Sequence, residues 1–97
     1  MKTTKASGRY AQALLSISQE HNVEDIVLNN CKAMLKMFNT ETDFADFVKN
    51  PTIAKSAKIQ FFNKVFVEFD NVMADFLTLV VKKGREPELR NIARRYI

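Results

Sequence analysis

Apolar residues recur along most of this chain at spacings of three and four, which is the period of an amphipathic α-helix. Short polar stretches interrupt the pattern and divide the sequence into about six segments. We therefore expect an all-α protein, folded as a single small bundle of about six helices. The predicted helices are 4–21, 23–38, a short one after a polar break at 39–43, 54–66, 71–83, and a last one that begins around 85–88.

Local signals at the segment ends support these boundaries. The break 39–43 offers several residues that can cap a helix N-terminus. The third helix should end before Pro51, because the residue that precedes a proline is pushed away from helical angles. Asp70 or Asn71 is a good cap for the fifth helix, and Gly84 suits the left-handed position that ends it. The last helix then begins with a proline flanked by glutamates, as expected at a helix N-terminus.

The stretch 61–67 also fits a strand, because aromatic and β-branched residues are dense there. A strand in this position would have no partner elsewhere in the sequence. Helical spacing is therefore the preferred interpretation.

The first and fifth helices are each apolar over two adjacent stripes, which is more than one contact with a core usually needs. On the first helix the stripes are Tyr10, Ala13, Leu14 and Ile17, and Ala11, Leu15 and Ser18. On the fifth they are Val72, Phe76, Leu79 and Val80, with Lys83 at the end, and Met73, Leu77 and Val81. Either both helices are central and enclosed, or one stripe on each is covered by a partner. The pattern alone favours neither.

Composition agrees with a small helical domain. The 97 residues are 46% hydrophobic, and they include only two glycines and two prolines, too few for the many turns of a sandwich or barrel. Residues 1–50 carry six cations and six anions, whereas residues 51–97 carry nine and five, a net charge of +4. A basic half can bind nucleic acid. Interleaved acids and the absence of an aromatic platform instead favour cations near helix C-termini and on a solvated face.

The sequence offers little for catalysis. His21 is the only histidine and Cys31 the only cysteine; we expect the first to be a helix-terminal cation and the second a small core residue. One of each is insufficient for a zinc site, and the acids around Asp43 match no calcium-loop spacing. No glycine-rich phosphate loop is present. We expect no enzyme activity, no metal and no cofactor, ATP included. Nor does the sequence contain a signal peptide or a run long enough to span a membrane.

Several short motifs resemble the δ subunit of F-type ATP synthases and the related mitochondrial oligomycin-sensitivity-conferring protein. Residues 9–14, with the sequence RYAQAL, resemble the RYAxAL segment of that family. Residues 47–51 are similar to its FLxxP, and residues 58–66 to the lysine and apolar pattern of its next helix. Residues 76–80 followed by Gly84, Arg85 and Leu89 resemble its FLxLL…GR…L block, and Tyr96-Ile97 its aromatic-aliphatic end. Asp75 and the pair Val80-Val81 depart from the usual pattern.

The resemblance implies a six-helix N-terminal domain, here 1–97, that sits on the catalytic head as a stator adapter in the peripheral stalk. It implies that the N-terminal helix of an α subunit binds between the first and fifth helices. Members of the family carry a second, C-terminal domain that grips the b-subunit stalk, and we expect this chain to lack it. The resemblance further implies a monomer without nucleic acid, held at the cytoplasmic face of a bacterial inner membrane through an ATP synthase complex. That complex transports either hydrogen ions or sodium ions, and the choice between them lies in the membrane ring.

This resemblance favours a partner-covered stripe on both helices. The predicted partner-binding residues are Tyr10, Ala13, Leu14, Ile17, Val72, Phe76, Leu79 and Lys83. The other stripes, represented by Ala11, Leu15, Leu77 and Val81, are then expected to fill the core. The alternative, a basic helical module that binds nucleic acid, differs in one measurable property: phosphate binding weakens steeply as salt rises, and an apolar contact does not.

Overall fold

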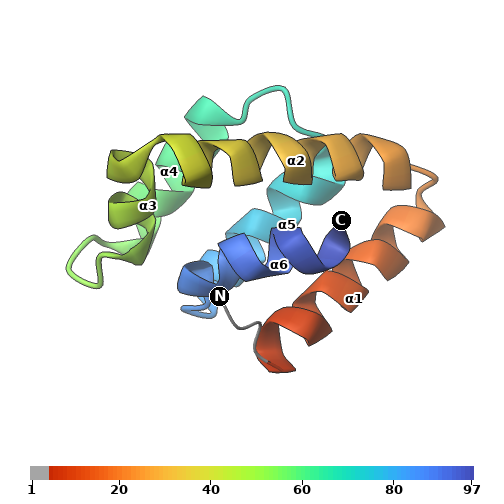
Figure 1. Ribbon diagram of the computed structural model, residues 1–97, viewed down its shortest axis with the longest axis horizontal. Coiled ribbons are helices and arrows are strands. Elements are labelled where there is room, and N and C mark those ends of the chain that lie inside the picture. The colour runs from red at the N-terminus through yellow and green to blue at the C-terminus, as the bar shows by residue number, and fades with distance from the viewer. Residues whose placement is uncertain (1–4) are drawn as a thin grey trace.

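The computed structural model describes residues 5–97, which form six α-helices and one short 3₁₀ turn, η1 (Figure 1). The described part of the chain contains no strand, so the predicted all-helical bundle is confirmed, including helix at most of 61–67. The predicted start at position 4 lies outside the described residues. The elements are α1 Lys5–Glu20, α2 Glu24–Thr40, α3 Thr42–Lys49, α4 Lys55–Val65, α5 Asn71–Lys82, η1 Glu86–Glu88 and α6 Leu89–Tyr96.

Most helix ends follow the local chemistry of the sequence. The Asp70 carboxylate accepts a hydrogen bond of 2.8 Å from the backbone N–H of Val72, so Asp70 is the N-cap of α5. Gly84 has a φ of 70°, the left-handed angle expected after that helix. Asn22 also has a positive φ, 57°, and turns the chain from α1 into α2. The sequence did not single out this turn, although asparagine tolerates the left-handed region better than most residues.

The start of α3 is less regular than the sequence suggested. Glu41 occupies the N-cap position without a side-chain capping bond. The hydroxyl of Thr40 instead donates to the backbone oxygen of Lys36, 2.8 Å away in the last turn of α2. One residue separates the two helices, so Thr40 belongs to α2 and cannot cap the next helix.

The last helix, α6, joins the two longest helices. It packs against both α1 and α2, while α4 packs against α5 (Figure 1). The hydroxyl of Tyr96 donates to the backbone oxygen of Glu24 at 2.9 Å and fastens the end of α6 to the start of α2. Gly8 permits the close approach of α1, because a Cβ there would lie 3.2 Å from the Arg95 guanidinium. These contacts hold α6 against both α1 and α2.

Nearly every helix contributes to one hydrophobic core. Its completely enclosed members include Leu14, Val27, Cys31, Met34, Met73, Val80, Val81, Leu89 and Ala93. A second region of the core is aromatic: Phe44 lies within ring-contact distance of Phe38, Phe61, Phe62 and Phe66. This aromatic region joins α2, α3 and α4, and α4 in turn supports α5.

Candidate partner-binding surface

The helices α1 and α5 meet at a pair of aromatic rings. Tyr10 and Phe76 lie 6.3 Å apart between ring centroids, at an interplanar angle of 72°, which is an edge-to-face contact. A hollow of about 290 Å³ lies next to this contact and is lined by Ala6, Arg9, Tyr10, Ala13 and Arg85. Because Arg85 follows the end of α5 and Ala6 lies near the start of α1, the two helices run in opposite directions.

The structure divides the predicted partner-binding residues into two groups. Ala13, Ile17, Leu79 and Lys83 are exposed, and Tyr10 and Val72 are half-buried. Leu14 is 0% exposed and Phe76 6%. Both therefore belong to the core and not to the surface stripes in which the sequence pattern placed them. Leu15, expected in the core, is half-buried instead. Ala11, Leu77 and Val81 are buried as expected.

The burial of Leu14 follows from the stripe that α1 presents to its neighbours. The buried residues of α1 are Ser7, Ala11, Leu14 and Ser18, at spacings of four, three and four. The sequence pattern placed Ser18 beside Ala11 but missed the polar Ser7, and it assigned Leu14 to the exposed stripe. On a neighbouring side of the helix, α6 approaches α1 closely at Gly8. On α5, Met73, Phe76, Leu77, Val80 and Val81 form one broad buried face.

Eight exposed or half-buried residues form a surface that we call the α1–α5 face. They are Ala6, Arg9, Tyr10, Ala13 and Ile17 on α1, Val72 and Leu79 on α5, and Lys83 directly after α5. The α1 residues follow one another at helical spacings of three and four, and four of them line or flank the hollow. Ile17 is 43% exposed and Leu79 44%, which places them among the few large apolar side chains left in water. Two cationic side chains, Arg9 and Arg85, line the hollow, and no acidic side chain is among its described lining.

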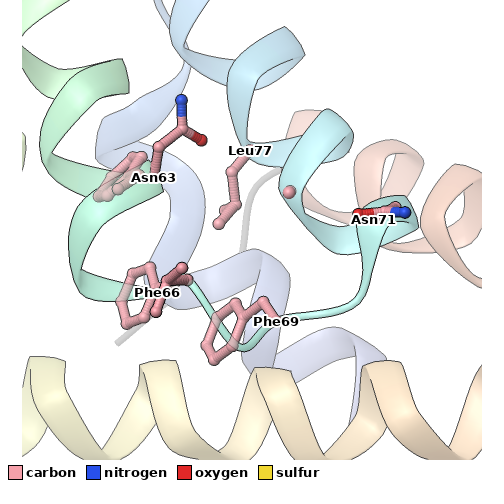
Figure 2. A pocket seen from close by; sticks show the side chains of 8 residues that line it. Asn63, Phe66, Phe69, Asn71 and Leu77 are labelled. Atoms are coloured by element: carbon pink, nitrogen blue, oxygen red, sulfur yellow. The ribbon is translucent and has the colours of Figure 1, made fainter.

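Two other hollows have a different character. One of about 120 Å³ lies in the seam between α4 and α5. Figure 2 shows Leu77 of α5 directed towards this seam, with Phe66 and Phe69 beyond it. These two rings stack at 4.3 Å and 8°. Exposed residues such as Asn63 and Asn71 also line the hollow, which therefore lies where the core meets the surface. Another hollow of about 340 Å³ lies among Met37, Phe44, Phe47 and Phe61, with Glu41 and Asp43 at its edge.

The residues with reactive side chains lie apart from the α1–α5 face. Cys31 is completely buried, and burial raises the pKa of its thiol from 9.0 to about 12, so the nucleophilic thiolate is absent near neutral pH. His21 is exposed beyond the end of α1. Within residues 5–97 there is no group of three or more histidine, cysteine or acidic side chains placed to hold a metal ion. None of the helices described is both long and apolar enough to cross a membrane.

Known proteins similar to this chain point to a single family. The family described as ATP synthase delta (OSCP) subunit matches residues 6–97. The chain is 35% identical over 89 residues to ATP synthase subunit delta of Acetivibrio thermocellus, covering 91% of this chain and 50% of that protein. It is 28% identical to the sodium ion specific ATP synthase subunit delta of Ilyobacter tartaricus, covering 92% of this chain and 51% of that protein. It thus spans about half the length of these relatives.

A solved structure shares the fold. A chain in the cryo-EM structure of the Toxoplasma gondii mitochondrial ATP synthase hexamer superposes with a TM-score of 0.89. The match covers 96% of this chain and 53% of that one, at 23% sequence identity. At this identity the superposition supports the arrangement of the helices.

Proposed function

Because this chain belongs to the ATP synthase delta (OSCP) subunit family, we propose that it is a non-catalytic stator adapter, which links the catalytic head of an F-type ATP synthase to its peripheral stalk. Residues 1–97 correspond in this proposal to the N-terminal domain. In the same proposal, the contact with the b subunit is made by the C-terminal domain of the family. The chain itself is a monomer that needs neither ATP nor another cofactor. It stays at the cytoplasmic face of a bacterial inner membrane only through the complex.

The proposed partner is the N-terminal helix of an α subunit, bound on the α1–α5 face. The observation that carries this proposal is the exposure of Ile17 and Leu79 on the two helices, with the small Ala13 in the hollow beside Tyr10. An amphipathic helix binds such a surface by inserting apolar side chains at positions i, i+3, i+4 and i+7. Phe76 supports the face from the core side, since it is buried and its ring contacts that of Tyr10.

A stator contact has to resist the torque of the rotor, so it must be tight, and it performs no chemistry. Each large apolar side chain buried on the face contributes roughly 1.5–3 kcal/mol before the ordering costs of binding. Nucleic acid is the less favoured partner. The basic residues of the C-terminal half are distributed over α4, α5 and α6, and one of them, Lys58, is buried in an ion pair.

Titration of the 97-residue chain with an α-subunit N-terminal peptide from the same organism tests this proposal. We expect one-to-one binding, with the largest amide chemical-shift changes on α1 and α5. Ile17→Glu should abolish binding, because a charge replaces an apolar contact. Ile26→Glu is the matched control, since Ile26 is 50% exposed and lies on α2. Absence of binding, or equal losses in both variants, would overturn the proposal.

A further inference from the structure

We propose that the hollow between Arg9 and Arg85 binds a carboxylate of the partner helix and thereby fixes the direction in which that helix lies. This inference rests on the proposed function, because it concerns the same face. It adds a requirement on the partner: an aspartate or glutamate on its apolar side, at one end of the row of apolar anchors.

The first argument is the composition of the hollow. Arg9 comes from α1 and Arg85 from the loop after α5, yet both line the same cavity of about 290 Å³. The other lining residues are Ala6, Tyr10 and Ala13, so the described lining of the hollow includes no acid. Neither guanidinium forms a hydrogen bond or an ion pair with a described residue. Two cations beside an aromatic ring match a carboxylate, because guanidinium donors suit its two oxygens.

Three other basic side chains of the protein are engaged with neighbouring groups. Lys58 is buried against Glu86, and Lys55 donates to the backbone oxygen of Lys82 at 3.0 Å. Arg90 donates to the side chain of Asn39. Arg9 and Arg85 differ from these three cations because they share a hollow beside the apolar residues of the face. Their guanidinium donors remain available within the described part of the chain.

The second argument is the distribution of charge along the face. Arg9, Lys83 and Arg85 lie at the end where α1 begins and α5 finishes. Glu20 follows Ile17 by three residues on α1, and Asp75 lies three residues after Val72 on α5, so both acids are placed towards the opposite end. The face is thus positive at one end and negative at the other. From Ala6 to Ile17 it extends about 17 Å, or about three helical turns.

A charge gradient of this kind selects one orientation of a bound helix. A partner with its acid at the Arg9–Arg85 end gains two favourable contacts, whereas the reversed helix would place that acid near Glu20 and Asp75. Like charges brought together at an interface suppress the wrong register more strongly than matched charges raise affinity. The apolar residues supply the affinity of the complex, and the charges determine the direction in which the partner helix binds.

The test uses the full 97-residue chain and the α-subunit N-terminal peptide, together with peptides in which each acid is changed singly to its amide. We expect Arg9→Ala and Arg85→Ala each to weaken binding roughly two- to fivefold, as single charge pairs at a rim do. Lys32→Ala, an exposed lysine on α2, should leave binding unchanged. One peptide amide should weaken binding to the wild type by a similar factor or more and have no further effect on the double variant Arg9→Ala with Arg85→Ala. The affinity of this peptide amide for the wild type should also depend less on salt than the affinity of the parent peptide does.

The outcomes separate the two proposals. If the wild type binds the peptide while both arginine variants match Lys32→Ala, the carboxylate inference is overturned and the proposed function stands. If every peptide amide binds like the parent peptide, the inference is also overturned. If the wild type binds no peptide, the proposed function fails and the inference fails with it. Thermal melts of the variants should match the wild type, because neither arginine has a partner within the described residues.

Discussion

The Nζ atom of Lys58 lies 2.6 Å from the Oε2 atom of Glu86 inside the protein, where Lys58 is 1% exposed and Glu86 6%. The same ammonium donates a 2.8 Å hydrogen bond to the backbone oxygen of Val48 in the last turn of α3. One buried side chain on α4 therefore connects three elements. The Oε1 atom of Glu86 is buried without a partner in the described structure, so this pair is only partly satisfied.

Removal of one partner of this ion pair should be strongly destabilising. Glu86→Ala leaves an ammonium uncompensated in the core, and such losses cost roughly 3–5 kcal/mol. The double variant Lys58→Met with Glu86→Leu should recover most of that stability, since apolar residues of similar volume often replace a buried pair without loss. Urea unfolding followed by circular dichroism measures both. A double variant less stable than Glu86→Ala would contradict this account.

Truncation should have different effects at two leucines of α5 that lie two positions apart. Leu77 is 2% exposed and points into the α4–α5 seam, so Leu77→Ala should lower the free energy of unfolding by roughly 2–5 kcal/mol (Figure 2). Leu79 is 44% exposed, so Leu79→Ala should cost little stability and weaken binding of the α-subunit peptide. Thermal melts beside a peptide titration measure both effects. If Leu79→Ala binds normally and Leu77→Ala melts normally, the side of α5 that we assign to the partner is wrong.

The sequence predicted the helices well because their signals are local. Asp70 caps α5 and Gly84 ends it, and each acts through backbone atoms within a few residues. The sequence placed Leu77 and Val81 in the core for a similar reason, since their spacing on one helix is enough to pair them.

Tertiary packing decided the features that the sequence missed. Leu14 is completely buried by helices that pack against α1. At Gly8, for example, α1 meets Arg95 of α6, a contact between positions 87 residues apart. Lys58 would ordinarily be assigned to the surface, and only its fold neighbours, Val48 and Glu86, make its burial tolerable. Arg85 was recognised as part of a motif, yet its position beside Arg9 depends on how α1 and α5 pack. Such contacts are not encoded in any short stretch.

The buried thiol of Cys31 should make stability depend on alkaline pH. Burial raises its pKa from 9.0 to about 12, so the unfolded chain loses this proton first as pH rises. The contribution to stability is fully present below about pH 9 and then falls by about 1.4 kcal/mol per pH unit towards about pH 12. Urea unfolding at several pH values measures this slope. Cys31→Ala is the control: its absolute stability is lower, but the difference from wild type should shrink as pH rises above about 9. A constant difference would show that the thiol does not ionise on unfolding.

The small size of Ala13 should matter more for binding than for folding. Ala13 is exposed in the middle of α1 and lines the hollow beside Tyr10, where a partner backbone has to come close. Ala13→Leu keeps a strong helix former and touches no core residue, so the free energy of unfolding should change by less than about 0.5 kcal/mol. The added side chain fills space that the partner helix needs, and we expect affinity for the α-subunit peptide to fall at least about tenfold, or about 1.4 kcal/mol. Ala33→Leu, at an exposed position of α2, makes the same chemical change away from the face and should bind normally. The peptide affinity of Ala13→Ser, which adds one small atom, should lie between those of Ala13→Leu and Ala33→Leu. Calorimetric titration gives all three affinities, and tighter binding by Ala13→Leu would mean that the partner contacts the face through its side-chain tips and leaves the hollow empty.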